Sequence, residues 1–390
     1  MKMKNTLMLA LLFVASVAGA QVNVAQQDEN SLVERIAKIE KKNDWFNLYL
    51  NMQTGFYTGF NQNGTDGFSG GAFKMPELRL EAKGKVNDWL SYRWRQRLNK
   101  SYEAKGVDGL PLAVDVAGLG FKATERLSFF VGRQCVAYGG FEFDANPIEI
   151  YQYSEIVDHM NIFMTGITAS YDFTPTQQMV VQVLNSNAKD ATEFYGDSVV
   201  AGSLPLVYSL GWNASMFDNA WQTRWSLSAM NEIEGKYMYY VALGNQFNIS
   251  KKWNMYIDFM GSIENIDRKG IMTEILESVD GYNVENALYG AVVAKVNYRF
   301  LPKWNVFVKG MFDCAGMLED GDTYSKGNYR TSLGYLAGIE YYPMADSNLH
   351  FFCTFVGQTN LFTERASAIG KSDYSTQRAS LGLIYKLPVF

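Results

Sequence analysis

Apolar and polar residues alternate along most of the chain after Trp45, in tracts of about ten residues. The alternation is clearest at Leu78–Lys83, Leu90–Arg95, Trp253–Phe259 and Trp304–Lys309. A period of two places successive side chains on opposite faces of a strand. Because about ten residues let a tilted strand cross the hydrocarbon layer, the pattern predicts strands with one face in lipid and the other in water.

Two kinds of connection separate these tracts, and they alternate along the chain. Short polar turns lie at residues 87–88, 124–126, 174–176, 218–219, 250–252, 301–303 and 343–348. Longer segments lie near residues 60–76, 100–112, 138–160, 185–205, 232–236, 263–286, 313–329 and 358–377. Seven short turns, with a first and a last strand, give sixteen strands. The layout predicts an all-β fold, a 16-stranded antiparallel transmembrane β-barrel over residues 45–390.

Aromatic residues gather beside the short turns. With 24 Tyr, 25 Phe and 8 Trp, the chain is rich in rings that favour the headgroup level of a membrane. Those nearest the turns are Trp45, Trp89, Phe173, Trp221, Trp253, Phe300, Trp304 and Tyr341. We interpret them as the girdle of the periplasmic rim, since β-propensity alone does not explain their position.

The first residues have the order of a secretory signal. Lys2 and Lys4 precede an apolar run from Leu7 to Val17, and Ala18–Ala20 offers a small-residue cleavage site. We therefore expect residues 1–20 to be a signal peptide and the mature chain to begin near Gln21.

A short helix is expected before the barrel, in residues 21–44. Leu32, Ile36 and Ile39 follow helical spacing among charged residues, although so short a coiled coil needs neighbours already held close. A trimer of barrels would supply them at its axis, and the alternative is a solvated periplasmic helix in a monomer.

Basic residues recur on one face of the predicted strands. Arg93, Arg95 and Arg97 are spaced two residues apart, so they share one face of a strand, opposite Tyr92 and Trp94. A charge at mid-depth in lipid costs about 2–4 kcal/mol, which favours the lumen for these side chains. The same reasoning predicts a basic wall that also includes Arg79, Lys83, Lys85, Arg133, Arg224, Lys295, Arg299 and Lys309.

The predicted third loop, about residues 138–160, is acidic. No Lys or Arg occurs from Gln134 to Ala188. The acids of the loop are Glu142, Asp144, Glu149, Glu155 and Asp158. If the loop folds inward, an acidic edge faces the basic wall and creates a transverse field that sorts ions. The alternative is that these acids lie on the outer rim.

One segment resembles a known family. Phe130–Gln134, followed by Tyr138–Gly140 and the acidic, aromatic stretch to Tyr153, is similar to the strand and third loop of the phosphate-selective porin O and P family, especially Bacteroidetes members. The resemblance implies a homotrimer of sixteen-stranded barrels. Each barrel would have its own pore, narrowed by an infolded third loop.

These observations predict an outer-membrane porin of a Gram-negative bacterium, in contact with outer-membrane lipid. We expect it to pass small ions and polar solutes passively, with a mild preference for anions, phosphate being one candidate. An alternative is a barrel that serves as a surface receptor or adhesion platform through its loops. A lipid hydrolase is a weaker alternative, because neither His159 nor His350 has a recognisable serine motif nearby.

Other chemistry finds little support in the sequence. The formal net charge of −5 argues against a nucleic-acid partner. Cys and His spacing indicates no metal site, and no motif in its proper structural context indicates a cofactor. We therefore expect a protein that is not an enzyme.

Overall fold

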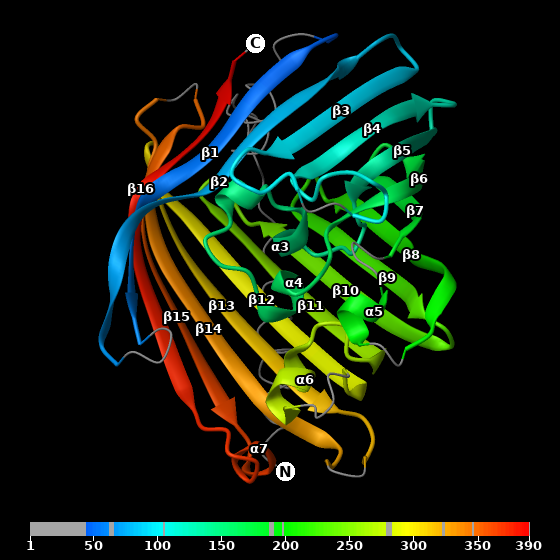
Figure 1. Ribbon diagram of the computed structural model, residues 1–390. Helices are drawn as coiled ribbons and strands as arrows, with labels where there is room; N and C mark the ends of the chain where they lie inside the picture. The colour runs from blue at the N-terminus through cyan, green and yellow to red at the C-terminus, as the bar shows by residue number, and fades with distance from the viewer. Residues whose placement is uncertain are drawn as a thin grey trace.

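The described strands close into a single antiparallel barrel (Figure 1). The computed structural model describes residues 44–61, 66–103, 106–186, 191–196, 199–277, 283–321, 324–344 and 347–389. The predicted signal peptide and the helix expected before the barrel lie outside these residues. Each strand pairs with its neighbours in sequence, and β1 pairs with β16 to complete the ring. The predicted 16-stranded barrel is therefore confirmed.

The strands are β1 (Asn47–Phe60), β2 (Phe68–Lys85), β3 (Leu90–Arg97), β4 (Val114–Lys122), β5 (Leu127–Cys135), β6 (Phe163–Thr174), β7 (Gln177–Asn185), β8 (Ala201–Met216), β9 (Trp221–Ile233), β10 (Lys236–Asn248), β11 (Trp253–Ile266), β12 (Glu285–Leu301), β13 (Trp304–Met317), β14 (Gly327–Tyr341), β15 (His350–Phe362) and β16 (Tyr374–Pro388). The helices are α3 (Phe141–Asp144), the 3-10 turn η1 (Pro147–Glu149), α4 (Glu155–Asp158), α5 (Ala191–Tyr195), α6 (Ile271–Leu276) and α7 (Glu364–Ser367). No helix in the described ranges is both long and apolar enough to cross a membrane.

The connections differ from the predicted ones mainly on the long-loop rim. All seven predicted short turns lie between consecutive strands. Several expected loops are instead strand: β2 begins at Phe68, inside the predicted loop 60–76, and only Glu234 and Gly235 separate β9 from β10. Beyond the hydrocarbon layer both faces of a strand meet water, so pairing continues where the apolar alternation has ended.

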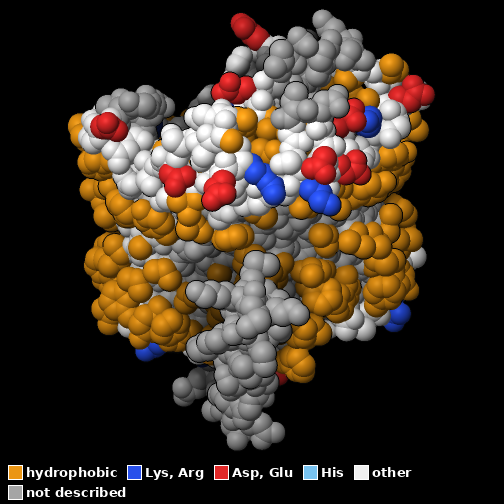
Figure 2. Space-filling view, turned by 90° about the horizontal axis from the view of Figure 1, so that it is seen from below, with side chains coloured by type: hydrophobic (Ala, Val, Ile, Leu, Met, Phe, Trp, Pro, Cys, Tyr) orange, Lys and Arg blue, Asp and Glu red, His pale blue; other side chains and the backbone are white. Residues whose placement is uncertain are grey.

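The outer surface carries the apolar face of the strands. Leu80 and Trp94 are 39% and 53% exposed, whereas their neighbours Arg79 and Arg95 are 1% and 9% exposed. On the face that Figure 2 shows, hydrophobic side chains form a broad band, and most of the acidic and basic side chains lie along one edge of it. This separation is the one expected of a wall between lipid outside and water inside.

Aromatic pairs link adjacent strands beside the short turns. Trp253 of β11 stacks on Tyr298 of β12 with ring centroids 4.2 Å apart, and Trp304 of β13 lies 4.7 Å from Tyr341 of β14. Such cross-strand pairs stabilise a sheet and place large rings at the height of the headgroups.

Small residues permit the closest approach between β1 and β16. Gly55 and Gly382 are partners in the register. A Cβ on Gly382 would lie 2.2 Å from the carbonyl oxygen of Thr54 and 2.7 Å from the ring of Phe352. The closing seam therefore has no room for a larger residue at this position.

We predict that Gly382→Ala destabilises the barrel by about 1–3 kcal/mol, the usual cost of overpacking a tight site. The free energy of unfolding is measured by titrating the refolded protein with denaturant, and the gel shift of the folded barrel in unboiled samples reports the folded fraction. Gly310→Ala in β13 is the control, because a Cβ there meets no atom within 4 Å. Equal stability of the two variants would contradict the tight seam.

Candidate functional site

The segment between β5 and β6, residues 136–162, folds into the lumen, and we call it loop 3. Figure 1 shows its helices α3 and α4 inside the ring of strands. Tyr138, Phe143 and Ile156 are buried in one cluster with the wall residues Tyr240 and Met260. The apolar side chains of loop 3 thus form a core with the interior face of β10 and β11.

A fully buried carboxylate fastens the middle of loop 3. Glu142 accepts hydrogen bonds from the backbone N–H of Ser154 at 2.9 Å and from its hydroxyl at 2.5 Å. It also forms an ion pair with Lys309 of β13, whose ammonium donates to the carbonyl of Gln152 at 2.6 Å. The Glu142–Lys309 pair joins the loop to the wall and closes the loop on itself.

Two further acids of loop 3 pair with cations of the same side of the barrel. Asp144 lies 2.8 Å from Arg224 of β9, and Glu155 lies 2.6 Å from Arg330 of β14. At Asp258 of β11 the wall supplies the carboxylate and the loop supplies the donors. This carboxylate accepts hydrogen bonds from the backbone N–H groups of residues 141 and 142, at 3.0 and 2.8 Å. Loop 3 is therefore held against the wall from β9 to β14.

A cavity of about 690 Å³ remains between loop 3 and the opposite wall, which β16, β1, β2, β3 and β5 form. We call this space the passage. Six cations and three acids line it among the described residues. These cations are Arg79, Arg97, Lys100, Arg133, Arg268 and Arg378, and the acids are Glu77, Asp158 and Glu232. The passage therefore carries an excess of positive side chains.

One carboxylate organises the arginines of the wall. Asp115 of β4 is fully buried and lies 3.1 Å from Arg79, 3.4 Å from Arg95 and 3.1 Å from Arg97. Three guanidinium groups share this one acid, although Arg79 also contacts Glu77 at 3.1 Å. The cluster is rigidly held and remains net positive.

The remaining cations of the passage lie outside this cluster. Arg133 pairs with Asp108 at 2.8 Å. Arg378 of β16 donates to the carbonyl of Tyr151 at 2.6 Å and has no ion pair within the described ranges. Desolvation, followed by the nearby Arg97, lowers the pKa of Lys100, as expected for an ammonium among other cations.

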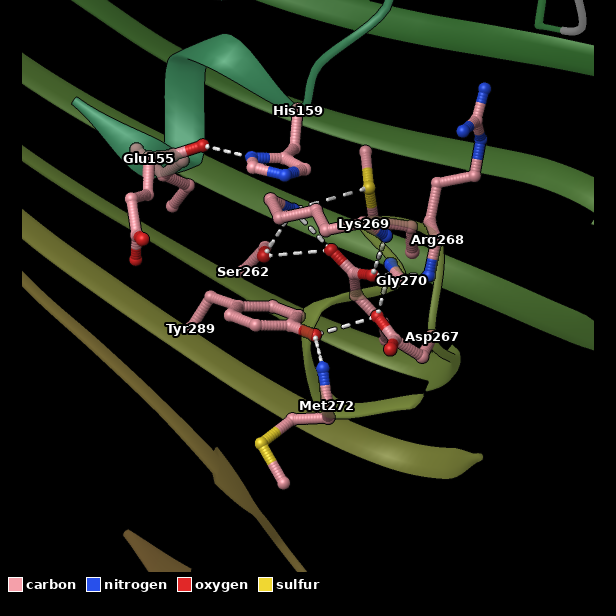
Figure 3. Close-up of polar contacts among 12 residues, drawn as sticks. Glu155, His159, Ser262, Asp267, Arg268, Lys269, Gly270, Met272 and Tyr289 are labelled. Carbon is pink, nitrogen blue, oxygen red and sulfur yellow. Dashed lines mark hydrogen bonds and ion pairs between the residues drawn. The ribbon is translucent and has the colours of Figure 1, made fainter. Parts of the chain in front are cut away.

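A second inward segment, after β11, positions Arg268. Figure 3 shows the buried hydrogen-bond network beside Arg268. In it, the ammonium of Lys269 donates to the hydroxyl of Ser262, and the hydroxyl of Tyr289 donates to Asp267 at 2.6 Å. Arg268 itself pairs with Glu232 at 2.7 Å and stacks on Phe194 of α5. Burial disfavours the charge on Arg268, but Glu232 outweighs that cost and the pKa of the guanidinium is raised.

The predicted basic wall is divided by the structure. Arg79, Arg97 and Arg133 line the passage. Four of the others form ion pairs: Arg93 with Glu81, Arg95 with Asp115, Arg224 with Asp144 and Lys309 with Glu142. Two lie over aromatic rings, Lys83 over Tyr49 and Lys295 over Phe307. Arg299 donates to the carbonyl of Pro302 at a short turn, and Lys85 is the last residue of β2.

The acids of loop 3 are also distributed differently from the expected acidic edge. Only Asp158 lines the passage. Glu142, Asp144 and Glu155 turn toward the wall that holds the loop, and Glu149 lies in η1. The reason is energetic, because a carboxylate in this crowded interior is stabilised by an adjacent cation and costs free energy without one.

Several residues of the site were not identified from the sequence. They are Lys100, Asp108, Asp115, Arg268, Arg330 and Arg378. Alternation was a usable signal for Arg378, which shares a strand face with Ser380 and Gly382. No comparable signal exists for Asp108, which lies in a loop.

Both histidines contact backbone oxygens through their rings. The Nδ1 atom of His159 lies 2.9 Å from the backbone oxygen of Glu155, and that of His350 lies 2.8 Å from the backbone oxygen of Asn348. In the part of the chain that the structure describes, no three His, Cys, Asp or Glu side chains form a group that could hold a metal ion.

We predict that Lys309→Met loosens loop 3 at a cost of about 3–5 kcal/mol, because it leaves the Glu142 carboxylate buried without a cation. Limited proteolysis of the refolded protein should then cut within residues 136–162. The double variant Glu142→Gln/Lys309→Met should recover most of the resistance. Lys303→Met, at an exposed turn, should resemble the wild type, and equal cleavage of all variants would argue against the anchor.

The comparisons with known proteins agree with this geometry. A family model described as phosphate-selective porin O and P matches residues 46–387. No curated protein sequence matches the chain. The fold is similar to that of the outer membrane channel DcaP of Acinetobacter baumannii, with a TM-score of 0.59 and 15% identity over 88% of this chain and 97% of that one.

Two further solved structures have similar folds. The trimer form of OmpT of Vibrio cholerae gives a TM-score of 0.55 at 10% identity, over 88% of this chain and 100% of that one. The anion-selective porin from Comamonas acidovorans gives a TM-score of 0.53 at 9% identity, over 88% of this chain and 100% of that one. Identities this low show a shared fold and nothing finer.

The family model, unlike these structural similarities, matches the amino-acid sequence, and the match covers the whole barrel from β1 to β16. The chain therefore belongs to the phosphate-selective porin O and P family, and it is an outer-membrane porin of a Gram-negative bacterium.

Proposed function

We propose that this porin passes small ions and polar solutes by passive diffusion, with a mild preference for anions. The observation that carries the proposal is the excess of cations around the passage, six against three acids among the described residues. Fixed charges in a narrow space with low-dielectric walls raise the local concentration of the opposite ion. The similar fold of the anion-selective porin from Comamonas acidovorans adds support by analogy.

Arg378 contributes strongly to this preference, because no carboxylate within the described ranges pairs with it. Its neighbours Arg79 and Arg97 share Asp115, which offsets part of their charge. Asp158, the one loop acid at the passage, offsets one of the six positive charges. The net field therefore favours anions without excluding cations.

We predict that Arg378→Gln lowers the anion-to-cation permeability ratio about twofold to threefold. One charge at about 7 Å in water is worth roughly 0.6 kcal/mol to each ion, with opposite sign for anions and cations, and salt screening about halves this energy. Reversal potentials across a planar bilayer in a potassium chloride gradient measure the ratio. Arg126→Gln at an exposed short turn is the control and should leave the ratio unchanged. Strong cation selectivity of the wild type would overturn the proposal.

We also propose that three copies of the chain assemble as a trimer. Strands β3, β4 and β5 have 8, 9 and 9 residues, whereas β11 and β12 have 14 and 17. A strand needs about 9–11 residues to cross the hydrocarbon layer, so the wall from β3 to β5 is low. A neighbouring barrel would cover this low wall, and the trimer form of OmpT offers an analogy.

Leu119→Arg in β4 should lower the trimer fraction, which crosslinking in detergent measures. Leu119 is 44% exposed on the outer face of the low wall. Leu227→Arg in β9 is the matched control, because Leu227 is 59% exposed on the taller wall and its substitution carries a similar cost in lipid. If both variants lose the trimer equally, or the wild type is a monomer, the low wall is not the interface.

The remaining proposals concern the N-terminus and the subfamily. We propose that residues 1–20 are removed as a signal peptide and that the helix within residues 21–44 lies in the periplasm below the trimer axis. N-terminal sequencing of the membrane-inserted protein should begin near Gln21. The stretch Tyr138–Tyr153 supports placement among Bacteroidetes-type members of the family.

A further inference from the structure

The passage has two faces of unlike chemistry. The wall face presents the guanidinium groups of Arg79, Arg97, Arg133 and Arg378. The opposite face, from loop 3 and the start of β6, is mainly apolar. Its lining residues include Ile150, Tyr151, Tyr153, Val157, Met160 and Phe163. A solute in the passage would therefore meet cations on one side and aromatic or aliphatic groups on the other.

The apolar face follows from the way loop 3 is anchored. Glu142, Asp144 and Glu155 are turned toward β13, β9 and β14, so their charges do not reach the passage. Tyr151 packs against Phe307 with ring centroids 5.2 Å apart, and its hydroxyl donates to Glu340 at 2.9 Å. Gln152, Asp158 and Asn161 also line the passage, but most of the loop 3 side chains there are aliphatic or aromatic.

The cationic face has guanidinium groups that a solute can reach. Arg97 and Arg378 line the passage and are partly exposed. Arg378 donates to backbone and amide oxygens of loop 3, and no carboxylate within the described ranges pairs with it. An oxyanion that accepted from these groups would form charge-assisted hydrogen bonds, which are stronger than those between neutral groups.

We propose that the passage selects small organic carboxylates with an aromatic or branched aliphatic body over inorganic phosphate. The carboxylate would accept from the wall arginines, for which a planar two-oxygen group is a good geometric match. The body would lie against the apolar face and leave water, which is favourable. Phosphate, by contrast, has no apolar body to place against this face and would lose part of its hydration beside it. This inference rests on the proposed anion preference of the porin.

Block of the chloride current through single channels in planar bilayers tests the proposal at pH 7.5. The probes are benzoate, inorganic phosphate, gluconate as an organic anion with a polar body, and benzylammonium as a cation of similar shape. Benzoate should reach half-block at about a tenfold lower concentration than phosphate or gluconate, a difference of about 1.4 kcal/mol. Benzylammonium should not block at these concentrations. Half-block by phosphate or gluconate at the concentration of benzoate, or below it, would overturn the proposal.

Variants separate the roles of the two faces. Tyr153→Ser and, with less risk to the loop, Ile150→Thr should raise the half-blocking concentration of benzoate several-fold and leave that of phosphate unchanged. Arg378→Gln should weaken block by both anions, and Arg126→Gln should alter neither. If the loop variants weaken benzoate and phosphate equally, the apolar face has no part in selection.

The same recordings distinguish this inference from the proposed function. A channel that prefers anions but blocks no better with benzoate contradicts the inference alone. A channel that prefers cations contradicts the proposed function and this inference together.

Discussion

Ion pairs between loop 3 and the wall determine where solutes can pass. Glu142 with Lys309, Asp144 with Arg224 and Glu155 with Arg330 hold the loop against β9 to β14. Breaking the buried pair of Glu142 with Lys309 would leave a charge buried without a partner, so this pair allows the loop few other positions. The passage is the space left on the other side of the lumen, beside β16 to β5.

The wall opposite the loop concentrates positive charge by sharing its acids. Asp115 alone contacts three arginines, and Arg378 contacts no acid in the described part of the chain. Repulsion among these guanidinium groups lowers the stability of the fold, and the attraction of Asp115 offsets part of this cost. Three of the five loop acids are thus paired with wall cations, whereas cations are in excess around the passage, and we propose this asymmetry as the basis of an anion preference.

The fold could be predicted from sequence because a two-residue period of apolar and polar side chains, in tracts long enough to cross the membrane, is typical of the strands of a β-barrel. It separated Trp94 from Arg93 and Arg95, and the seven short turns expected from it all lie between consecutive strands. The site could be predicted only in part. Alternation indicates the face on which Lys309 lies, but its partner Glu142 is 167 residues away, and nothing local reveals that pairing. For this reason the loop acids were expected at the passage, where only Asp158 lies.

The central claim is that anions find their most favourable site between loop 3 and the arginine wall. Crystals grown in sodium bromide, with anomalous diffraction measured at the bromine edge, would locate bound anions directly. We expect bromide beside Arg79, Arg97 and Arg378, with loop 3 folded inward against β9 to β14. Bromide bound only outside the passage, or a loop 3 extended from the rim with Glu142 in solvent, would contradict the account.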